Sequence, residues 1–342
     1  MASSVVVLMS GGVDSTVAAL VLKEQGYEVI GVTFNFNSRC GNVQDIDDAR
    51  KMAKKIGIRH EVIDLADYFR REIIQYFLDE YRNGRTPNPC ALCNRRVKLH
   101  WGVKVADEFG CEFVATGHYA RVTHEEGDVH LKKALWEDKS QEYYLALIEK
   151  EHLRRLVLPL GEMSKEEVRE KAKEFGLEVH DKEESQDVCF VGKDYRSFLL
   201  KKGFERREGL IVDENGNVLG KHDGYYFFTI GQRRGIGVAV GERLYIKEII
   251  PDKNIVVVAP LEKLYRDSFF VQNVNFLEGL REGEILEVRV RYRGKTAECT
   301  LHPYAEDTYK VELRSELFAI TPGQVAVFYR GDTVVGGGII SG

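Results

Sequence analysis

Short apolar runs and helical segments alternate up to about residue 200, and this alternation restricts the possible folds more than any other feature. Strands are predicted at 5–9, 27–34, 60–65 and 112–119, with helices at 16–26 and 45–57. A further helix at 164–176 opens with a capping box from Ser164 to Glu167. Short strand–helix–strand connections favour a parallel sheet with helices on both faces. We therefore expect an α/β, Rossmann-like domain.

The pattern changes after about residue 203. Aromatic and β-branched runs, broken by Asn-Gly and Gly turns, predict antiparallel strands from there to the end. We predict three domains: a catalytic α/β domain at 1–203, a small central β domain at 204–264 and a C-terminal β-barrel at 265–342.

The composition is that of a globular protein, with 44% hydrophobic and 30% charged residues. The apolar run at 255–261 is far too short to span a membrane, and the N-terminus carries no export signal. We expect a cytoplasmic protein without a membrane partner. Its six cysteines are not expected to form structural disulfides. Cys40, Cys111 and Cys299 have no cysteine neighbour and are expected to be packing or surface residues.

The net charge of −5 argues mildly against a nucleic-acid partner, but the placement of charge matters more than its total. Residues 85–104 hold Arg85, Arg95, Arg96, Lys98 and Lys104 and no acid, and residues 201–208 form a second basic cluster. Four further basic residues alternate along the chain, so a strand would place them on one face: Arg289, Arg291, Arg293 and Lys295.

A glycine-rich loop, SGGVDS at 10–15, lies between the first predicted strand and the first predicted helix. Gly11 and Gly12 allow backbone N–H groups to face an anion at the helix N-terminus, and Ser10 and Ser15 add hydroxyl donors. Asp14 would be unusual in a phosphate site unless it helps to hold Mg²⁺. The loop lacks the lysine of the kinase-type phosphate loop. It matches the loop of the N-type ATP pyrophosphatases, which release pyrophosphate while adenylating a substrate oxygen.

Two cysteines, Cys90 and Cys93, have C-x-x-C spacing in GRTPNPCALCNRR at 84–96. Such a pair can bind a metal, cycle as a redox dithiol or carry sulfur. The spacing alone leaves these three functions open.

The chain resembles one family, the tRNA-specific 2-thiouridylases, over nearly its whole length. The matching segments run in the family's order from residue 8 to 329: SGGVDS, GRTPNPCALCNRRVK, ATGHYAR, DKSQEYYLALI, LPLGEMSKEEVREKAKEFGL, KEESQDVCFV, GYYFFTIGQRRGIG and AITPGQVAVFY. The resemblance implies an adenine nucleotide alpha hydrolase-like ATP domain, a central β domain and a C-terminal barrel.

The implied reaction adenylates C2 of the wobble uridine, position 34, in tRNAs for Lys, Glu and Gln, and then replaces the oxygen with sulfur. Its cofactors are ATP and Mg²⁺, and its partners are tRNA and a sulfur donor, either a protein or sulfide. The target base must leave the anticodon stack to react.

Site residues are carried over from the family's motifs. Cys189 would carry the persulfide, with Cys93 as its partner cysteine. The ATP-binding positions would be Leu8, Met9, Ser10, Gly11, Gly12, Val13, Asp14, Ser15, Phe34 and Gly117. The tRNA-contacting positions would be Asn88, Pro89 and Cys90 at the base, and His118, Lys139, Ser140, Gln141, Arg291, Tyr292 and Gln324 elsewhere.

The sequence departs from the family at Cys90, where the commonest motif has Asp, and in DKSQEYY, where K-D-Q-S-Y is usual. Cys90, Cys93 and Cys189 could hold a [4Fe–4S] cluster with one open iron. The alternative keeps a Cys189 persulfide and releases sulfur by forming a Cys93–Cys189 disulfide. Zinc would normally require a fourth ligand. Arg95, Arg96 and a helix N-terminus could lower the pKa of the thiols in either route.

Two other functions compete with thiolation. One is a non-catalytic tRNA-binding module, which the intact SGGVDS loop and the three cysteines disfavour. The other is a ligase with a pyrophosphate loop that acts on a small molecule, for which the two β domains would be dispensable; activity without RNA would identify it.

Overall fold

The computed structural model describes residues 2–36, 43–178, 188–192, 194–238, 241 and 243–342. Two compact units divide the chain. The first comprises residues 1–74, 90–192 and 331–335, and the second comprises residues 75–89, 193–330 and 336–342. Each unit is therefore assembled from segments that lie far apart in the sequence.

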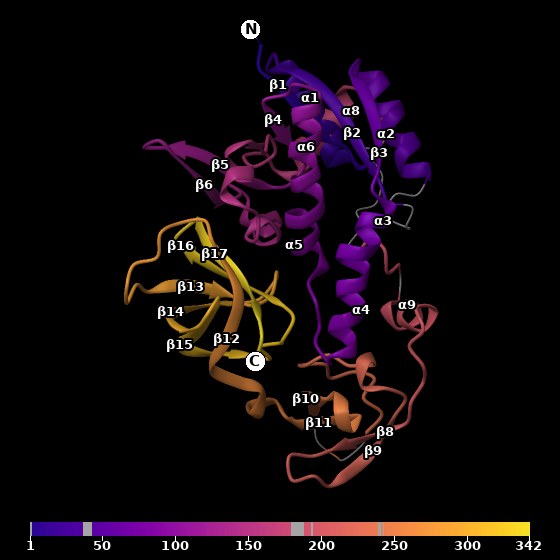
Figure 1. The fold of residues 1–342 in the computed structure, drawn as a ribbon, viewed down its shortest axis with the longest axis vertical. Coiled ribbons are helices and arrows are strands. Elements are labelled where there is room, and N and C mark those ends of the chain that lie inside the picture. The colour runs from indigo at the N-terminus through magenta and orange to yellow at the C-terminus, as the bar shows by residue number, and fades with distance from the viewer. Residues whose placement is uncertain (1, 37–42, 179–187, 193, 239–240, 242) are drawn as a thin grey trace. The chain divides into compact units, whose positions relative to one another are not determined.

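A five-stranded parallel sheet forms the centre of the first unit, in the order β3-β2-β1-β4-β7 (Figure 1). Its strands are β1 (Ser4–Leu8), β2 (Glu28–Asn35), β3 (Arg59–Asp64), β4 (Phe113–Ala115) and β7 (Leu156–Val157). The chain leaves β1 toward β2 and later returns to the other side of β1 as β4. A crevice opens at the carboxyl ends of strands where the order reverses in this way. The predicted Rossmann-like fold is confirmed.

Helices cover this sheet. Those around the first strands are α1 (Val13–Glu24), α2 (Val43–Ile56) and α8 (Lys165–Glu174). α1 packs against α2 and α8, and Val17, Ala18 and Ala19 on it are fully buried. The predicted capping box is present at the start of α8. Its two reciprocal hydrogen bonds satisfy N–H groups that a helix start otherwise leaves unpaired.

Further helices continue the chain between β3 and β4. They are α3 (Ala66–Phe69), α4 (Gln75–Arg82), α5 (Pro89–Cys93) and α6 (His100–Glu108), and α7 (Lys150–Arg154) follows later. π-helical turns at Arg70–Ile74 and Asn94–Leu99 connect α3 to α4 and α5 to α6. The C-x-x-C pair therefore lies on a short helix and not in a loop.

A β-hairpin that the sequence did not lead us to expect extends the first unit. It pairs β5 (Ala120–Glu125) with β6 (Asp128–Lys133) through a turn in which Glu126 and Gly127 both have positive φ. In β17 (Thr333–Ile340), Thr333 pairs with Lys132 of the hairpin. The neighbouring Asp332 accepts from Arg121 at 2.8 Å.

The second unit contains a four-stranded sheet in the order β10-β11-β8-β9, preceded by α9 (Tyr195–Lys201). The strands are β8 (Gly209–Val212), β9 (Val218–His222), β10 (Leu244–Ile250) and β11 (Ile255–Pro260). The prediction of a purely antiparallel sheet is wrong, because β8 and β11 pair in parallel. The chain between them, which includes β9 and β10, is long enough for the crossover that parallel pairing requires.

A closed six-stranded antiparallel barrel follows, as predicted. Its strands are β12 (Tyr265–Phe276), β13 (Leu286–Arg289), β14 (Thr296–Ala305), β15 (Thr308–Phe318), β16 (Val325–Arg330) and β17. Pairing of β12 with β17, for example Val271 with Ile340, closes the ring. The predicted basic strand face is wrong, because β13 ends at Arg289 and the chain turns where Gly294 N–H donates to the Arg291 carbonyl.

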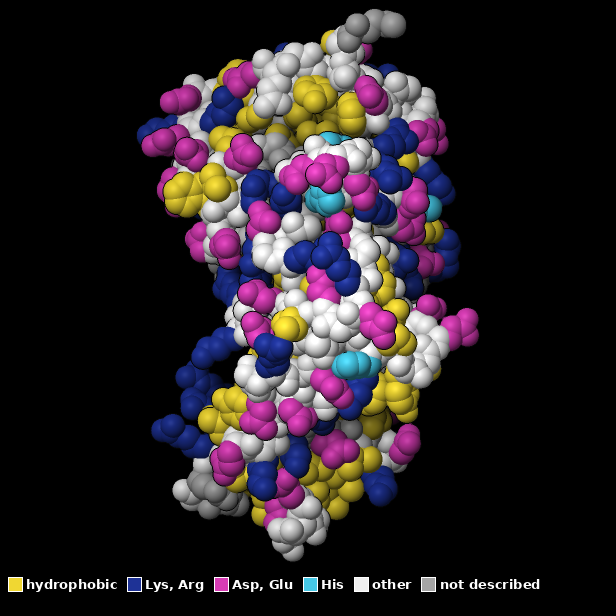
Figure 2. Space-filling model, turned by 90° about the vertical axis from the view of Figure 1, so that its left-hand side faces the viewer, with side chains coloured by type: hydrophobic (Ala, Val, Ile, Leu, Met, Phe, Trp, Pro, Cys, Tyr) yellow, Lys and Arg dark blue, Asp and Glu magenta, His cyan; other side chains and the backbone are white. Residues whose placement is uncertain are grey.

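Lys and Arg side chains lie among Asp and Glu side chains over most of the face that Figure 2 shows, and Lys and Arg side chains gather on a projection at its lower left. No helix in the described part of the chain is long and apolar enough to cross a membrane.

Candidate active site

The loop that joins β1 to α1 has the backbone shape that anion binding requires. Gly11 has a φ of 71°, and a Cβ there would collide with the Asp45 carbonyl, so only glycine fits. The Ser10 N–H donates to Ser15 Oγ at 3.1 Å, and the two serine hydroxyls lie 3.1 Å apart. These bonds fix the loop against the first turn of the helix.

The N-terminus of α1 is available to a phosphate. Gly12 is the N-cap residue, and no side chain caps the helix. The first N–H groups of a helix have no intrahelical partner, and the helix dipole is positive there. Phosphate oxygens are suitable acceptors for these groups. The positions predicted to bind ATP between Leu8 and Ser15 thus lie together at the end of β1 and the start of α1.

Gly117 lies directly against this loop. A Cβ at Gly117 would stand 2.6 Å from the Ser15 nitrogen and 2.7 Å from the Asp14 carbonyl carbon. Only glycine can bring the segment after β4 this close to the loop after β1. The structure therefore places Gly117 at the crevice where the strand order reverses, beside the other predicted ATP positions.

Asp14 is paired within the protein. Lys165 Nζ donates to its two carboxylate oxygens at 2.7 and 2.9 Å, and Tyr119 Oη donates to Oδ1 at 2.7 Å. The Lys165 side chain is only 6% exposed. A carboxylate held by a buried ammonium is poorly placed to bind Mg²⁺ directly, in contrast to our expectation from the sequence. Sequence reasoning missed Lys165, although it is the first residue of the helix with the predicted capping box.

An aromatic row extends from the predicted ATP site. Phe34 at the end of β2 lies 6.3 Å from Phe36, and Phe36 stacks on Phe69 at 4.3 Å between ring centroids. Phe69 in turn makes an edge contact with Phe190 at 5.7 Å. Phe190 is buried and anchors the exposed turn that carries Cys189. The row therefore holds the Cys189 turn to the carboxyl-end side of β2.

Cys90 and Cys93 are both free thiols on α5. Burial raises the pKa of both, to about 12 for Cys93, and Lys98 opposes the rise in each case. The expectation that Arg95 and Arg96 lower these values is wrong. Each of those guanidinium groups lies near a carboxylate, Arg95 near Glu149 at 3.9 Å and Arg96 near Glu72 at 3.4 Å.

His118 lies beside this pair through Asn94. Asn94 Nδ2 is 3.4 Å from His118 Nε2 and also donates to the Tyr144 carbonyl at 3.0 Å. Thr116 Oγ1 is 2.8 Å from the other ring nitrogen. Burial, with a smaller contribution from Lys98, lowers the pKa of His118 to about 3, so the ring is neutral at physiological pH.

Asn94 is a site residue that sequence reasoning missed. It is 2% exposed, and its Oδ1 is buried without a hydrogen-bond partner in the described part of the chain. A buried, unpaired acceptor costs about 1–3 kcal/mol, which a ligand that donates a hydrogen bond would recover. The available signal was its position, immediately after the second cysteine of the C-x-x-C pair.

Cys189 is disulfide-bonded, whereas Cys90, Cys93, Cys111 and Cys299 are free. The expectation of a chain without disulfides is therefore wrong at Cys189, because pairing depends on tertiary proximity, which sequence spacing does not reveal. Cys111 and Cys299 are buried, as expected of packing residues, and Cys40 lies outside the described residues.

The three cysteines predicted to share a cluster are not assembled as a metal-binding group. No group of three or more His, Cys, Asp or Glu side chains suited to a metal ion occurs among the residues that the structure describes. Cys189 is also engaged in its disulfide. The residues as placed do not fit a [4Fe–4S] cluster.

In the second unit, the barrel holds the segment that precedes Cys90. Gln324 Nε2 donates to the Thr86 and Pro87 carbonyls at 2.8 and 3.3 Å, and the Thr86 N–H donates to the Pro322 carbonyl at 2.9 Å. These bonds fix the chain immediately before Asn88 and Pro89, the predicted base-contacting positions. Gln324 itself uses its amide nitrogen within the protein.

Arg291 is also directed inward. Its guanidinium donates to the Ile230 and Ala319 carbonyls at 3.0 and 2.8 Å and to Thr321 Oγ1 at 2.6 Å. It thereby joins the turn after β13 to the segment before β16 and to residue 230. Beside it, the Arg293 guanidinium lies 5.9 Å from the centre of the Tyr292 ring.

The predicted tRNA-contacting residues 139–141 lie after the hairpin in the first unit. Ser140 is buried, accepts from the Ala134 N–H at 2.7 Å and donates to Glu142. Gln141 Oε1 accepts from the Tyr119 N–H at 3.1 Å. Both side chains are used within the protein, while Lys139 is partly exposed.

Three family models match the chain. They are described as a tRNA methyl transferase HUP domain at residues 3–193, a tRNA methyl transferase PRC-barrel domain at 196–260 and an Aminomethyltransferase beta-barrel domain at 266–340.

Curated proteins align over almost the whole chain. The tRNA-specific 2-thiouridylase MnmA of Clostridioides difficile is 42% identical over 355 residues, covering 99% of this chain and 98% of that protein. The protein of the same name from Carboxydothermus hydrogenoformans is 42% identical over 353 residues, covering 98% and 97%.

Similarity to solved structures is weaker. The U34-tRNA thiolase NcsA from Methanococcus maripaludis with its [4Fe-4S] cluster aligns with a TM-score of 0.37 and 21% identity, covering 58% of this chain and 64% of that chain. Similarity at this level says nothing further about this chain.

Proposed function

This chain belongs to the family of tRNA-specific 2-thiouridylases, and from that membership we propose that it is an ATP-dependent sulfurtransferase that makes 2-thiouridine in tRNA. The reaction is the adenylation of C2 of the wobble uridine, followed by replacement of the oxygen with sulfur. AMP and pyrophosphate are the other products.

One structural observation carries this proposal: a continuous path from the anion-binding loop to the two free thiols of the C-x-x-C pair, of which Cys93 is buried and Cys90 partly exposed. Gly117 packs on Ser15 of the loop, and the next residue, His118, lies 3.4 Å from Asn94. Asn94 follows Cys93 directly in the chain. ATP chemistry and sulfur chemistry can therefore share one crevice.

In the first step the uridine C2 oxygen attacks the α-phosphorus of ATP, and pyrophosphate leaves. The helix N-terminus and the Ser10 and Ser15 hydroxyls supply donors for the negative charge that develops on the departing oxygens. Asn94 Oδ1, beside His118, is a buried acceptor that receives no hydrogen bond from the described residues. The uridine N3–H is a donor of the right kind for it.

In the second step the terminal sulfur of a Cys189 persulfide attacks C2, and AMP leaves with the former uridine oxygen. Cys93, of which burial leaves only a small thiolate fraction, then attacks the Cys189 sulfur as that thiolate, so that the S–S bond breaks and the new sulfur stays on the base. A Cys93–Cys189 disulfide forms, and a cellular dithiol reductant returns it to thiols. The present Cys189 disulfide must be reduced before the persulfide can form.

Cys90 replaces the family's usual Asp, and we assign it no cluster and no step. We expect Cys90→Asp to retain thiolation within about threefold of the wild type, because the aspartate restores the common motif. Protein purified without oxygen should contain no stoichiometric iron or sulfide. Loss of activity in Cys90→Asp, together with stoichiometric iron in the wild type, would contradict this.

Mg²⁺ would be held chiefly by the ATP phosphates and water, as is usual where a protein offers no dedicated set of ligands. Asp14 would not contact Mg²⁺ and would instead hold the Lys165 ammonium beside the phosphate loop. The proposed substrates are the tRNAs for Lys, Glu and Gln, and the reaction takes place in the cytoplasm. The sulfur donor is a persulfide-bearing protein, which passes its outer sulfur to the Cys189 thiol and keeps a thiol itself.

The test is conversion of an unmodified tRNA transcript by the purified protein, first reduced with a dithiol, with ATP, Mg²⁺ and a persulfide donor. We expect 2-thiouridine by mass spectrometry of the digested RNA, with pyrophosphate released in equal amount. Cys93→Ser should release pyrophosphate but make no 2-thiouridine. Cys111→Ser is the matched control, since Cys111 is a buried free thiol of the same unit. Absence of 2-thiouridine with every tRNA offered would refute the proposal.

A further inference from the structure

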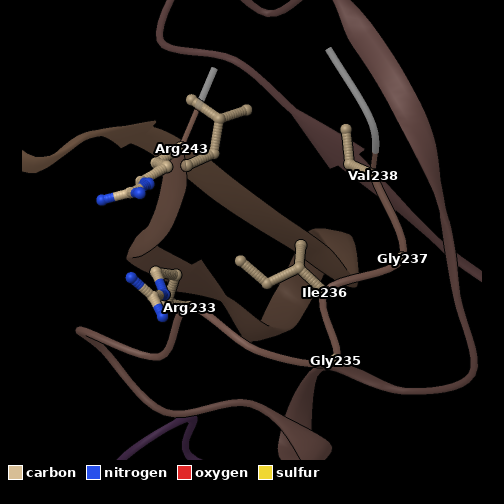
Figure 3. Close-up of a pocket in the computed structure, with 7 residues that line it drawn as sticks. Arg233, Gly235, Ile236, Gly237, Val238 and Arg243 are labelled. Atoms are coloured by element: carbon tan, nitrogen blue, oxygen red, sulfur yellow. The ribbon is translucent and has the colours of Figure 1, made fainter. Parts of the chain in front are cut away.

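Two adjoining hollows lie on the second unit, and basic side chains line both of them. One has a volume of about 320 Å³ and includes Arg233 and Arg243, as Figure 3 shows. The other has a volume of about 250 Å³ and includes Arg196, Arg206 and Lys221. Gly235 and Ile236 line both hollows, so the two lie side by side, and we treat them together as one surface. We call this the basic groove.

The charge of the basic groove is poorly neutralised. Asp223 is the acidic residue among its described lining residues, and it pairs with Arg206. Lys221 pairs with Glu208 at 2.8 Å, and both side chains are largely exposed. Exposed ion pairs contribute little to stability, so a stronger anion can replace the carboxylates.

Arg233 and Arg243 are exposed and have no hydrogen bond or ion pair in the described part of the chain. Figure 3 shows both guanidinium groups on the same side of the hollow. Most other arginines among the described residues contact a carboxylate or a carbonyl, as Arg85 and Arg155 do. Two unpaired guanidinium groups in one hollow repel each other, and a shared anion would relieve this repulsion.

The backbone of the groove is also suited to close contact with a ligand. Gly235 and Gly237 have φ values of 71° and 84°, and a Cβ at Gly237 would meet nothing within 4 Å. Ile236 between them is only 7% exposed and anchors the segment. Glycine backbone beside an arginine lets a phosphate approach N–H groups that side chains would otherwise cover.

We propose that the basic groove binds the sugar–phosphate backbone of the tRNA substrate, as a contact separate from recognition of the reacting base. This inference rests on the proposed function for its ligand. A polyanion of regularly spaced phosphates suits a groove lined by several arginines, because each arginine can take one phosphate. Such contacts fix the orientation of the RNA without reading its sequence.

The test compares the double variant Arg233→Glu/Arg243→Glu with Lys253→Glu/Lys263→Glu. The lysine pair is exposed, lies in the same unit outside the groove and changes the net charge equally. Binding of an unmodified tRNA transcript is measured over a series of salt concentrations. The arginine variant should bind roughly tenfold more weakly at low salt and lose about two units from the slope of log K against log salt. The lysine variant should stay within about twofold of the wild type.

Kinetics add a second readout. In the arginine variant the KM for tRNA should rise, while kcat at saturating tRNA and the KM for ATP stay unchanged. Equal tRNA affinity and salt slope in the arginine variant and the wild type would overturn the inference. The inference would also be overturned if the arginine variant bound tRNA normally and lost only the transfer of sulfur from a donor protein. The groove would then bind an acidic protein and not tRNA. If the wild type binds tRNA through the groove but makes no 2-thiouridine, the inference stands and the proposed function fails.

Discussion

Lys98 influences three groups of the site at once. Its charge lowers the pKa of the Cys90 and Cys93 thiols and of His118, in each case as a contribution smaller than that of burial. From the sequence, Lys98 was only one member of a basic segment. Its effect depends on the helical path from α5 to α6, which places it near residues that come before it and after it in the chain.

Replacement of Lys98 by methionine should therefore raise the pKa of both thiols. We expect iodoacetamide to alkylate Cys90 and Cys93 roughly two- to fivefold more slowly in Lys98→Met than in the wild type at pH 8, because less thiolate is present. Peptide mass spectrometry measures the alkylation of Cys90 and of Cys93 separately. Lys104→Met is the control, since Lys104 lies over the Trp101 ring and acts on neither thiol. Identical rates in all three proteins would exclude this function of Lys98.

The raised pKa of Cys93 predicts the direction of a pH dependence. With a pKa of about 12, Cys93 is almost entirely a neutral thiol at pH 7. Its thiolate fraction should rise about tenfold per pH unit between pH 7 and 10, with no plateau in that range. Alkylation of Cys93 measured along this series checks the sign, and a plateau below pH 9 would mean that the thiol is more acidic than its burial implies.

The Asp14–Lys165 pair yields a prediction in which two changes should compensate. Lys165→Met leaves Asp14 as an unpaired charge beside the phosphate loop, so the Kd for ATP should rise by about 10- to 100-fold. Adding Asp14→Asn removes that charge and should recover much of the affinity. Calorimetric titration with ATP measures both variants. Lys171→Met is the control on the same helix, because Lys171 pairs with Glu24 instead.

The opposite outcome would also be informative. If Asp14→Asn/Lys165→Met binds ATP no better than Lys165→Met, the carboxylate itself is needed, and Asp14 would act on Mg²⁺ directly as the sequence first suggested.

Among the elements, α8 links local sequence to the site most directly. Its N-cap Ser164 accepts from the Glu167 N–H, and the first helical residue is Lys165. Ser164→Ala should lower the free energy of unfolding by about 1 kcal/mol, since one capping bond is lost. Ser164→Asp should retain most of the stability that the cap contributes, because an aspartate side chain also accepts a hydrogen bond at the N-cap. Urea denaturation compares the three proteins, and equal midpoints for Ser164→Ala and the wild type would refute the contribution of the cap.

Elements with strong local signals were predictable, and those determined by distant pairing were not. The parallel sheet followed from apolar runs separated by helical segments, and α8 followed from its cap. The β5–β6 hairpin was missed, although Glu126-Gly127 forms the kind of turn that joins two strands. The basic strand face at 289–295 was wrong because alternation alone cannot show that Gly294 turns the chain there.

The same limit applies to the site. The SGGVDS loop and the C-x-x-C pair were visible in the sequence, because each is contiguous. The roles of Lys165, Asn94 and Lys98 depend on contacts between segments that are separate in the chain, or on burial. The inward direction of Arg291 could not be inferred either, because its three acceptors lie at residues 230, 319 and 321.

For the whole molecule, the division into two compact units predicts two thermal unfolding transitions. The phosphate loop belongs entirely to the first unit, so ATP should raise the midpoint of one transition and leave the other within about 1 °C. Differential scanning calorimetry with and without ATP makes the comparison, with Lys165→Met as a binding-deficient control. A single transition that shifts as a whole with ATP would show that the units unfold together.

The late contribution of Thr333 to the first unit has a consequence for how such a protein is made and how it can evolve. The hairpin emerges from the ribosome some two hundred residues before the strand that contacts Lys132 and the Asp332 that binds Arg121. A nascent chain must therefore wait with that edge of the unit unpaired until residues 332 and 333 have been synthesised. For the same reason, a gene fragment that stops after residue 192 would not carry the whole first unit into another protein, because residues 331–335 also belong to it.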